Sequence, residues 1–287
     1  MAQEAVASSG QLKRGLGLER IGELLFTKTV MGIISAIVAA IFWEWLGRSG
    51  LALGFPTFTS VIVAWADLIT NGTLAKEVPK TLQSFAVGYA ISIGVGVILG
   101  ALIGRFALFD RLFSPYINGL MSTPKVAFIP IFIIWFGATS IWPRVAMVFL
   151  YSFYVIVINT ATGVKNADFN LIEMARSFGA KERQLFTKVL LPSAIPMIIA
   201  GLRLGTARAI KGMITGEMLI TIVGMGGLLT MYGASFMTDY LFAMIFTVFV
   251  LAFLANVVVE KLEYRLVGWR AESVGTRAKR AKASAEA

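Results

Sequence analysis

The chain has 287 residues, of which 57% are hydrophobic and only 15% are charged, and its mean hydropathy is +0.78. Soluble domains are about 45–50% apolar and about 25% charged, so this composition indicates an integral membrane protein and excludes an ordinary soluble domain. Cysteine and histidine are both absent from the sequence, which excludes disulfides, thiol catalysis and metal sites built from these residues.

The net charge of +10 would suggest a nucleic-acid partner if the chain were soluble. The basic residues do not form a separate domain, however, and most lie in segments that flank apolar stretches. Lysine and arginine accumulate on the cytoplasmic side of membrane proteins. We therefore expect contact with lipid and no binding of nucleic acid.

The first 28 residues are polar and carry charges of both signs. They lack the short apolar core and the small-residue cleavage site of a secretory signal. We expect residues 1–28 to form a cytoplasmic N-terminal segment.

Six apolar stretches could each cross a membrane, because about 20 predominantly apolar residues span a ~30 Å hydrocarbon core. The sequence thus predicts an all-α, polytopic membrane helix bundle with six transmembrane helices. In chain order these are Thr29–Gly47, Thr81–Gly104, Asn118–Gly137, Pro143–Val164, Ser193–Glu217 and Tyr240–Val259.

Two further segments complete the expected organisation. Residues 48–79 are expected to form an outer loop, in which the amphipathic stretch Thr59–Ile69 lies along the membrane surface. Residues 266–287, rich in Ala, Lys, Arg and Glu, are expected to form a cytoplasmic tail.

The distribution of basic residues predicts the orientation of the spans. With both termini in the cytoplasm, eighteen of the 26 Lys and Arg residues lie on the cytoplasmic side, four lie on the outer side and four lie within spans. This bias favours a topology with both ends inside the cell.

Glycines recur at intervals of four in the second and fifth spans. Small residues four apart share one face of a helix and let another backbone approach closely. Both helices are therefore predicted to pack against protein along the faces that carry Gly96, Gly100 and Gly104, and Gly201, Gly205, Gly212 and Gly216.

A charged segment, residues 165–192, separates the fourth and fifth spans. Its apolar residues follow helical spacing, and Asp168 or Asn170 could cap a first helix. Gly179 stands where a helix end favours a left-handed residue, and a second helix is predicted from Ala180 to Leu190, ended by Pro192. Such a pair of short helices suits docking into a groove of another protein, although an ordinary amphipathic loop would give the same pattern.

The spacing of this segment resembles a known loop. Glu173-Met174-Ala175, Gly179 after three more residues, and Val189-x-Leu191-Pro192 after a further nine resemble the EAA…G…I-x-LP loop of the membrane subunits of bacterial ABC importers. Met174 replaces an alanine and Val189 an isoleucine. The resemblance extends over roughly residues 80–265 and is strongest to the branch that handles nitrate, taurine, alkanesulfonates and vitamin precursors.

The resemblance implies the type I importer permease fold of the methionine and maltose importers, with residues 80–265 as the ABC transmembrane type-1 domain and 166–192 as its coupling loop. The loop would bind a separate ATPase through seven residues: Glu173, Met174, Ala175, Phe178, Gly179, Leu191 and Pro192. ATP and Mg²⁺ would stay on that ATPase, because this chain has no GxxxxGK[ST] loop, and the chain would need no cofactor and be no enzyme.

The resemblance also implies partners and a location. One coupling loop per chain and two ATPases per transporter imply a homodimer. A periplasmic or surface solute-binding protein would deliver the substrate. The expected location is the bacterial inner membrane.

Ionisable residues within spans usually face a cavity or pair with one another. Lys211, near the middle of the fifth span, is a candidate for a translocation path that favours an anion, or else for an interhelical pair. Glu217, Lys125 and Asn159 are further path candidates, and Pro124 is expected to break the helix before Lys125. Arg203 and Arg208, which resemble arginines of the family, are expected to be structural.

The glycine-rich stretch 221–239 is not expected to form a regular spanning helix, and it could be part of an outer gate or a plain loop.

Three other functions fit parts of the pattern. A secondary transporter or channel driven by an ion gradient is the main alternative, although the sequence shows no internal repeat and no aspartate in mid-span. A membrane-embedded enzyme would need a cluster of catalytic residues, which the sequence does not offer. A scaffold without transport would keep the loop but lack a polar path.

Overall fold

The computed structural model describes residues 28–51, 54–220 and 223–285, and side chains from 30 to 261. Every regular element in these ranges is a helix, so the predicted all-α class is confirmed. The helices are α2 (Lys28–Ser49), α3 (Phe58–Thr70), α4 (Thr73–Arg105), α5 (Ala107–Ser122), η1 (Lys125–Phe128), α6 (Ile129–Phe136), α7 (Trp142–Lys165), α8 (Phe169–Ser177), α9 (Glu182–Leu185), η2 (Phe186–Leu190), α10 (Leu191–Ile220), α11 (Gly224–Ala234) and α12 (Thr238–Ala285).

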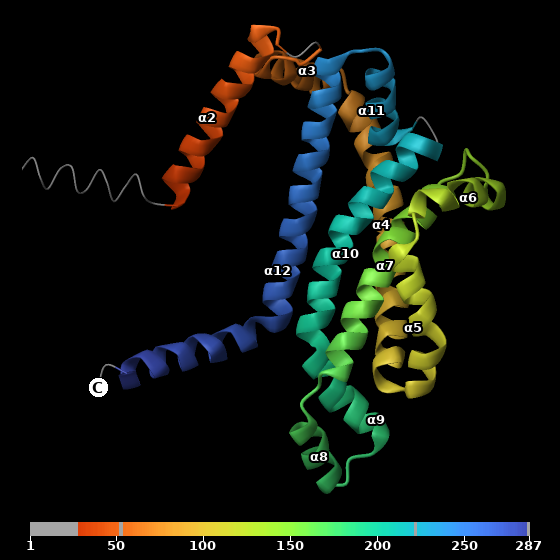
Figure 1. Cartoon of the computed structure of the whole chain (residues 1–287), viewed down its shortest axis with the longest axis vertical. Helices are drawn as coiled ribbons and strands as arrows, with labels where there is room; N and C mark the ends of the chain where they lie inside the picture. Colours follow the sequence, from red (N-terminus) through yellow and green to blue (C-terminus); the bar gives the residue numbers. More distant parts are fainter. Residues whose placement is uncertain (1–27, 52–53, 221–222, 286–287) are drawn as a thin grey trace, which may run out of the picture.

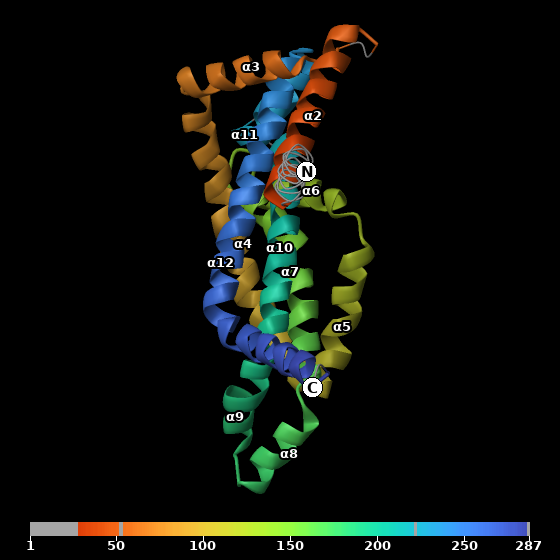
Figure 2. The ribbon, with the colours of Figure 1, turned by 90° about the vertical axis from the view of Figure 1, so that its left-hand side faces the viewer.

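Three long helices, α4, α7 and α10, run along the long axis of the molecule (Figures 1 and 2). Helices α8 and α9 project beyond one end, and α3 lies across the other end. We call these the α8 end and the α3 end.

Five helical stretches are long and apolar enough to cross a membrane, and the number rises to six if one bent pair counts as a single span. The described part of the chain is therefore that of a multi-pass membrane protein. The bent pair, 107–122 and 125–136, turns by 105°.

The third span, predicted over Asn118–Gly137, begins earlier than predicted, and its helix is broken at Pro124 as expected. The helix α5 begins already at Ala107 and ends at Ser122, and the chain resumes as η1 and α6 after the break. Pro124 explains the break, because proline lacks an N–H and forces the residue before it out of the helical region. Thr123 is accordingly extended, at φ −77° and ψ 136°.

The predicted outer loop, residues 48–79, extends too far at its C-terminal end. Helix α4 begins at Thr73, so Pro79 lies inside it and does not end it. Two contacts hold these first turns in place: Leu74 packs in a buried cluster, and the carboxylate of Glu77 accepts a hydrogen bond from Gly224 N at 2.9 Å.

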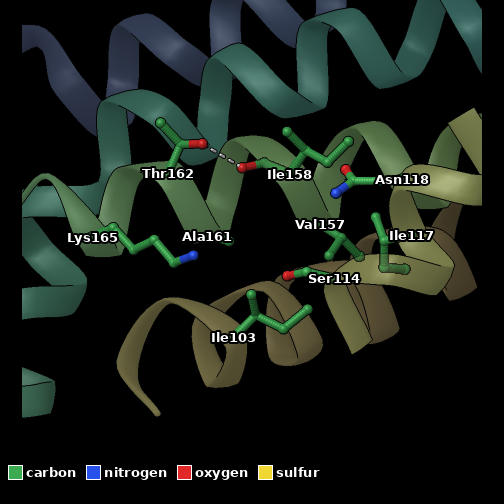
Figure 3. Close-up of a pocket in the computed structure, with 9 residues that line it drawn as sticks. All are labelled: Ile103, Ser114, Ile117, Asn118, Val157, Ile158, Ala161, Thr162 and Lys165. Carbon is green, nitrogen blue, oxygen red and sulfur yellow. Dashed lines mark hydrogen bonds between the residues drawn. The ribbon is translucent and has the colours of Figure 1, made fainter. Parts of the chain in front are cut away.

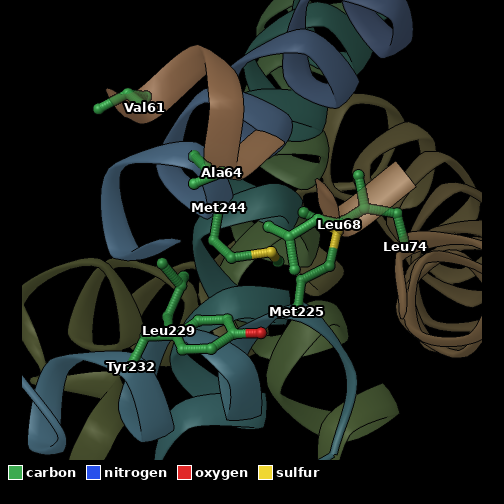
Figure 4. Packing of buried hydrophobic residues seen from close by; sticks show 9 residues of the cluster. Val61, Ala64, Leu68, Leu74, Met225, Leu229, Tyr232 and Met244 are labelled. Atoms are coloured by element: carbon green, nitrogen blue, oxygen red, sulfur yellow. The ribbon is translucent and has the colours of Figure 1, made fainter. Parts of the chain in front are cut away.

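The amphipathic stretch predicted before it is confirmed as α3. Its buried residues Val61, Ala64 and Leu68 share one face and pack against Met225 and Met244, from α11 and α12 (Figure 4).

Glycine faces on α4 and α10 pack against the two sides of α7, as predicted. A Cβ added to Gly100 would lie 2.6 Å from Thr160 Cβ, and one added to Gly212 would lie 2.8 Å from Met147 O. At Gly94, by contrast, an added Cβ would meet nothing within 4 Å. These close approaches leave α7 mostly buried between its two neighbours.

Hydrogen bonds also join the three helices. Tyr89 of α4 donates to Leu202 O of α10 at 2.7 Å, and Thr206 of α10 donates to the Tyr89 hydroxyl at 2.9 Å. Ser152 of α7 donates to Ser92 of α4 at 2.7 Å. In an apolar bundle such bonds fix the helices in register, so α4, α7 and α10 form one tightly packed unit.

The first span, α2, is attached mainly through its C-terminal end. Trp43 Nε1 donates to Pro56 O at 3.1 Å, and Glu44 accepts a hydrogen bond from Thr59 N at 3.0 Å. The rest of the helix is exposed and apolar, and it leans away from the bundle (Figure 1).

Candidate functional site

The segment at the α8 end begins with a capped helix. The Asp168 side chain accepts a hydrogen bond from Asn170 N at 2.9 Å, so Asp168 is the N-cap of α8. This arrangement satisfies one of the backbone donors that a helix start leaves without a partner.

Gly179 ends this first helix, as its position predicted. Its φ is +74°, in the left-handed region where a side chain is strained. Gly179 N donates to Arg176 O at 2.8 Å and Ala180 N to Ala175 O at 3.0 Å. These two bonds make a Schellman motif, which fixes the direction in which the chain leaves α8.

The second helix differs from the prediction at both ends. It begins at Glu182, passes through the π-helical stretch Phe186–Leu190 and continues without interruption into α10. Pro192 therefore does not end it. The reason is local: Leu191 N bonds to Phe186 O across a wide π turn, and Pro192 then falls in the first turn of α10, where proline is tolerated.

The tip of this segment carries exposed apolar side chains. Phe178 is 84% exposed, Met174 is 52% exposed and Leu171 is 42% exposed, and Glu173 is exposed beside them. Leu171, Met174 and Ala175 also line a hollow of about 410 Å³ together with Lys188, Val189, Pro192 and Ser193. Leu191 and Pro192 are half-buried and form the base of the segment.

Ion pairs tie the segment to the bundle. Glu182 of α9 pairs with Arg105 at the end of α4 and, at 3.5 Å, with Arg176 of α8. The sequence analysis missed these pairs, because no spacing along the chain indicates a contact between residues 105 and 182.

A separate cavity of about 180 Å³ lies between α4, α5 and α7 (Figure 3). Apolar side chains such as Ile103, Ile117 and Val157 line it together with Asn118 and Lys165. Lys165 Nζ also pairs with Asp110 at 2.7 Å.

Three of the four basic residues within spans lie on α10. Arg203, Arg208 and Lys211 are exposed, and we call the exposed side of α10 that carries them its charged face. The fourth, Lys125, donates to Met121 O at 2.9 Å, lies 4.5 Å from the centre of the Tyr154 ring, and is close enough to Arg208 to interact with its charge.

The other two path candidates lie between helices. Asn159 donates to Val155 O of its own helix at 2.8 Å and packs against Gly201 of α10. Glu217 is fully buried, and its Oε2 accepts hydrogen bonds from Thr81 Oγ1 at 2.9 Å and from Gly226 N at 3.0 Å.

The sequence analysis missed the surroundings of Glu217. Arg144, at the start of the predicted span Pro143–Val164, is only 8% exposed, and its Nη1 lies 3.9 Å from Glu217 Oε1. The glycine-rich stretch forms α11, whose 11 residues are too few to span a membrane, and residues 221–222 lie outside the described ranges.

Known transport proteins resemble this chain over most of its length. ThiX of Halalkalibacterium halodurans, named as a formylaminopyrimidine transport permease protein, is 31% identical over 82% of this chain and 93% of its own length. SsuC of Bacillus subtilis, named for aliphatic sulfonates transport, is 29% identical over 83% and 86%. TauC of Escherichia coli, a taurine transport system permease protein, is 26% identical over 70% and 73%.

A solved structure supports the fold. The MetNI methionine ABC transporter, in an inward-facing conformation, contains a chain that matches with a TM-score of 0.57 and 20% sequence identity, over 66% of this chain and 94% of that one. The predicted type I importer permease fold is therefore confirmed.

The pattern of one family matches residues 92–268, which include the projecting segment and the charged face of α10. This chain belongs to the family of binding-protein-dependent transport system inner membrane components, the membrane permease subunits of ABC transporters.

Proposed function

We propose that this permease binds an ATPase subunit through the segment from Phe169 to Leu190 and imports a small solute when that ATPase hydrolyses ATP. The exposed apolar tip around Met174 and Phe178, held in shape by the joint at Gly179, carries the proposal. An exposed apolar cluster on a short helix is a surface that a partner's groove can cover. The chain itself is no enzyme, and ATP and Mg²⁺ would bind to the partner.

The charged face of α10 supports a homodimer. Arg208 and Lys211 are exposed in a single copy, yet charges in mid-membrane do not face lipid. Facing a second copy across a water-filled path gives them a polar environment. Two copies would also present two segments to two ATPases.

The same face points to the substrate class. Arg208 and Lys211 bring positive charge to the exposed side of α10, and the charge of Lys125 acts on Arg208. A path lined in this way favours an anion. Relatives named for sulfonate and taurine transport support this class, whereas those named for formylaminopyrimidine and riboflavin leave a vitamin precursor as the second candidate.

The orientation follows from the ATPase. Because ATP is cytoplasmic, the α8 end and both termini would lie in the cytoplasm of a bacterial inner membrane. The α3 end would then face a periplasmic or surface solute-binding protein.

Purification of the full chain in mild detergent, co-expressed with its candidate ATPase, tests the proposal. We expect the ATPase to co-purify and Gly179→Asp to weaken its retention. Gly72→Asp is the matched control, because Gly72 has nearly the same φ, +75°, and equally open surroundings at the other end of the molecule. Equal loss in both variants would contradict docking at Gly179.

Uptake into vesicles separates this function from its main alternative. We expect uptake of a sulfonate to require ATP and to fall in Lys211→Met, while ATPase binding is kept. Uptake that depends only on an ion gradient, by a chain that purifies alone, would instead favour a secondary transporter.

A further inference from the structure

Three consecutive N–H groups open α11, and each donates a hydrogen bond to a side chain of another helix. The donor and acceptor pairs are Gly224 N to Glu77 Oε2 at 2.9 Å, Met225 N to Thr81 Oγ1 at 2.9 Å, and Gly226 N to Glu217 Oε2 at 3.0 Å. The first N–H groups of a helix have no partner within the helix. Side chains of α4 and α10 therefore hold the start of α11.

Two glycines bring α11 into direct contact with Glu217. A Cβ on Gly224 would lie 2.5 Å from Glu217 Oε1, and a Cβ on Gly226 would lie 2.5 Å from Glu217 Cβ. Only glycine fits at such distances. The carboxylate of Glu217 is therefore enclosed by the backbone of α11 as well as bonded to it.

Arg144 of α7 offers the same carboxylate a second partner. Its Nη1 lies 3.9 Å from Glu217 Oε1, which is too far for a hydrogen bond. Arg144 Nε and Nη1 and Glu217 Oε1 are all buried without a hydrogen-bond partner. Buried charged groups gain most from direct, charge-assisted hydrogen bonds, so this pair is incomplete in the present conformation.

A direct hydrogen bond between Arg144 and Glu217 would weaken the bond from Gly226 N that holds the start of α11. The two carboxylate oxygens move together, so a movement of about 1 Å that brings Oε1 within hydrogen-bond distance of Arg144 also displaces Oε2 from its present position beside Gly226 N. That bond has an ordinary length of 3.0 Å in the present conformation, and such bonds weaken as they lengthen. Glu217 thus has two partners that compete for it, which is the arrangement of a two-state contact.

We propose that Glu217 is a positioning residue that exchanges between the start of α11 and Arg144, and so releases and recaptures α11 on the outer side during transport. The proposal rests on the proposed function, because the helical stretch from Glu182 to Ile220 links the ATPase-binding segment to Glu217. Movement of that segment would reach α11 through this one carboxylate.

The chain contains no cysteine, so single introduced cysteines can report on α11. Leu229→Cys places a reporter on α11, where the side chain is 7% exposed, and Ser92→Cys places a control between α4 and α7, where it is 0% exposed. The full chain, in membrane vesicles with its ATPase, is labelled with N-ethylmaleimide before and after addition of ATP and vanadate.

The two substitutions of Glu217 are expected to act on different quantities, the basal labelling rate and its response to ATP. Glu217→Ala removes the hold on α11 and should raise the labelling rate at Leu229→Cys by about tenfold without nucleotide, since a buried bond is lost. Glu217→Gln keeps an acceptor for Gly226 N but offers no charge to Arg144. It should leave the basal rate unchanged and abolish the response to ATP. Arg144→Gln removes the competing partner and should do the same.

Three results would overturn the proposal: faster basal labelling in Glu217→Gln, a normal ATP response in that variant, or no ATP response in the parent chain with the ATPase bound. Faster labelling at Ser92→Cys in the Glu217→Ala background would show that the whole bundle is loosened. The proposal is then tested by the isosteric Glu217→Gln alone. Failure of the ATPase to co-purify would contradict the proposed function instead, and the basal rates would still report on Glu217.

Discussion

The two ends of the helical stretch from Glu182 to Ile220 handle charge in opposite ways. At the α8 end, Glu182 is 64% exposed and pairs with arginines that water also reaches. At the α3 end, Glu217 is 0% exposed, and its hydrogen bonds come from two helices of its own chain, α4 and α11. The charged group at the α3 end is thus buried within the chain itself, whereas the α8 end presents an exposed surface that a partner could cover. We expect substitutions at the buried end to act on stability and those at the exposed end to act on binding.

A substitution that separates α4 from α7, two of the helices that run between the two ends (Figure 1), should have the largest effect. In Gly100→Leu the added Cβ would lie 2.7 Å from Val157 O and 2.6 Å from Thr160 Cβ, so the helices must separate. We expect a loss of about 3 kcal/mol or more, at the upper end of overpacking costs, seen as aggregation or a lower melting temperature in detergent. Gly94→Leu is the control, because Gly94 has open surroundings. Equal effects would contradict the packing of α4 on α7.

Thr81→Val should have the next largest effect and act on the buried end. The Thr81 hydroxyl donates to Glu217 Oε2 and accepts from Met225 N, both at 2.9 Å. Its loss leaves Met225 N without a partner and removes one of the two donors to Glu217 Oε2, so the free energy of unfolding should fall by about 1–3 kcal/mol. The measurement is thermal unfolding in detergent, with Thr70→Val, at an exposed position of α3, as the control. ATPase binding at the opposite end should not change.

At the exposed end, Phe178→Ser should weaken ATPase binding without lowering stability. An exposed aromatic side chain at the centre of an interface contributes about 1–2 kcal/mol, which corresponds to about a tenfold rise in Kd or more. Phe236 is the matched control, since it is 87% exposed against 84% for Phe178 but lies at the other end. Titration of the purified ATPase onto both variants gives the comparison, and a similar Kd for the two would place the docking surface elsewhere.

The smallest effect is expected for Glu182→Gln, which removes the pairs with Arg105 and Arg176. Ion pairs exposed to water contribute about 0.2–1 kcal/mol and are screened by salt. ATPase binding should therefore weaken less than about fivefold, and only at low ionic strength. Asp110→Asn breaks the comparable pair with Lys165, which precedes the ATPase-binding segment Phe169–Leu190, and should leave binding unchanged. A larger loss for Glu182→Gln at high salt would show that the pair is buried in the complex.

The contrast between the two ends also explains what the sequence could predict. The helix α8, its cap and the joint at Gly179 depend on neighbouring residues, so their spacing predicted them. The glycine faces were predictable for the same reason. The hydrogen bonds that hold the start of α11 join residue 224 to 77, 225 to 81 and 226 to 217, and they depend on the relative position of three helices, which no local pattern encodes.

Proline residues were poor predictors of where helices end. Pro124 breaks its helix, whereas Pro79 and Pro192 lie inside theirs. The outcome depended on whether the surrounding chain supplied other contacts, such as the packing of Leu74 or the π turn before Leu191.

The bonds that shape the first helix of the projecting segment all fall within residues 168–180. Its shape therefore owes little to the helices that would line the path, and the two can diverge separately in evolution. A lineage could change which solute is carried while keeping the same docking shape. Several permeases with different cargoes could then share a single ATPase.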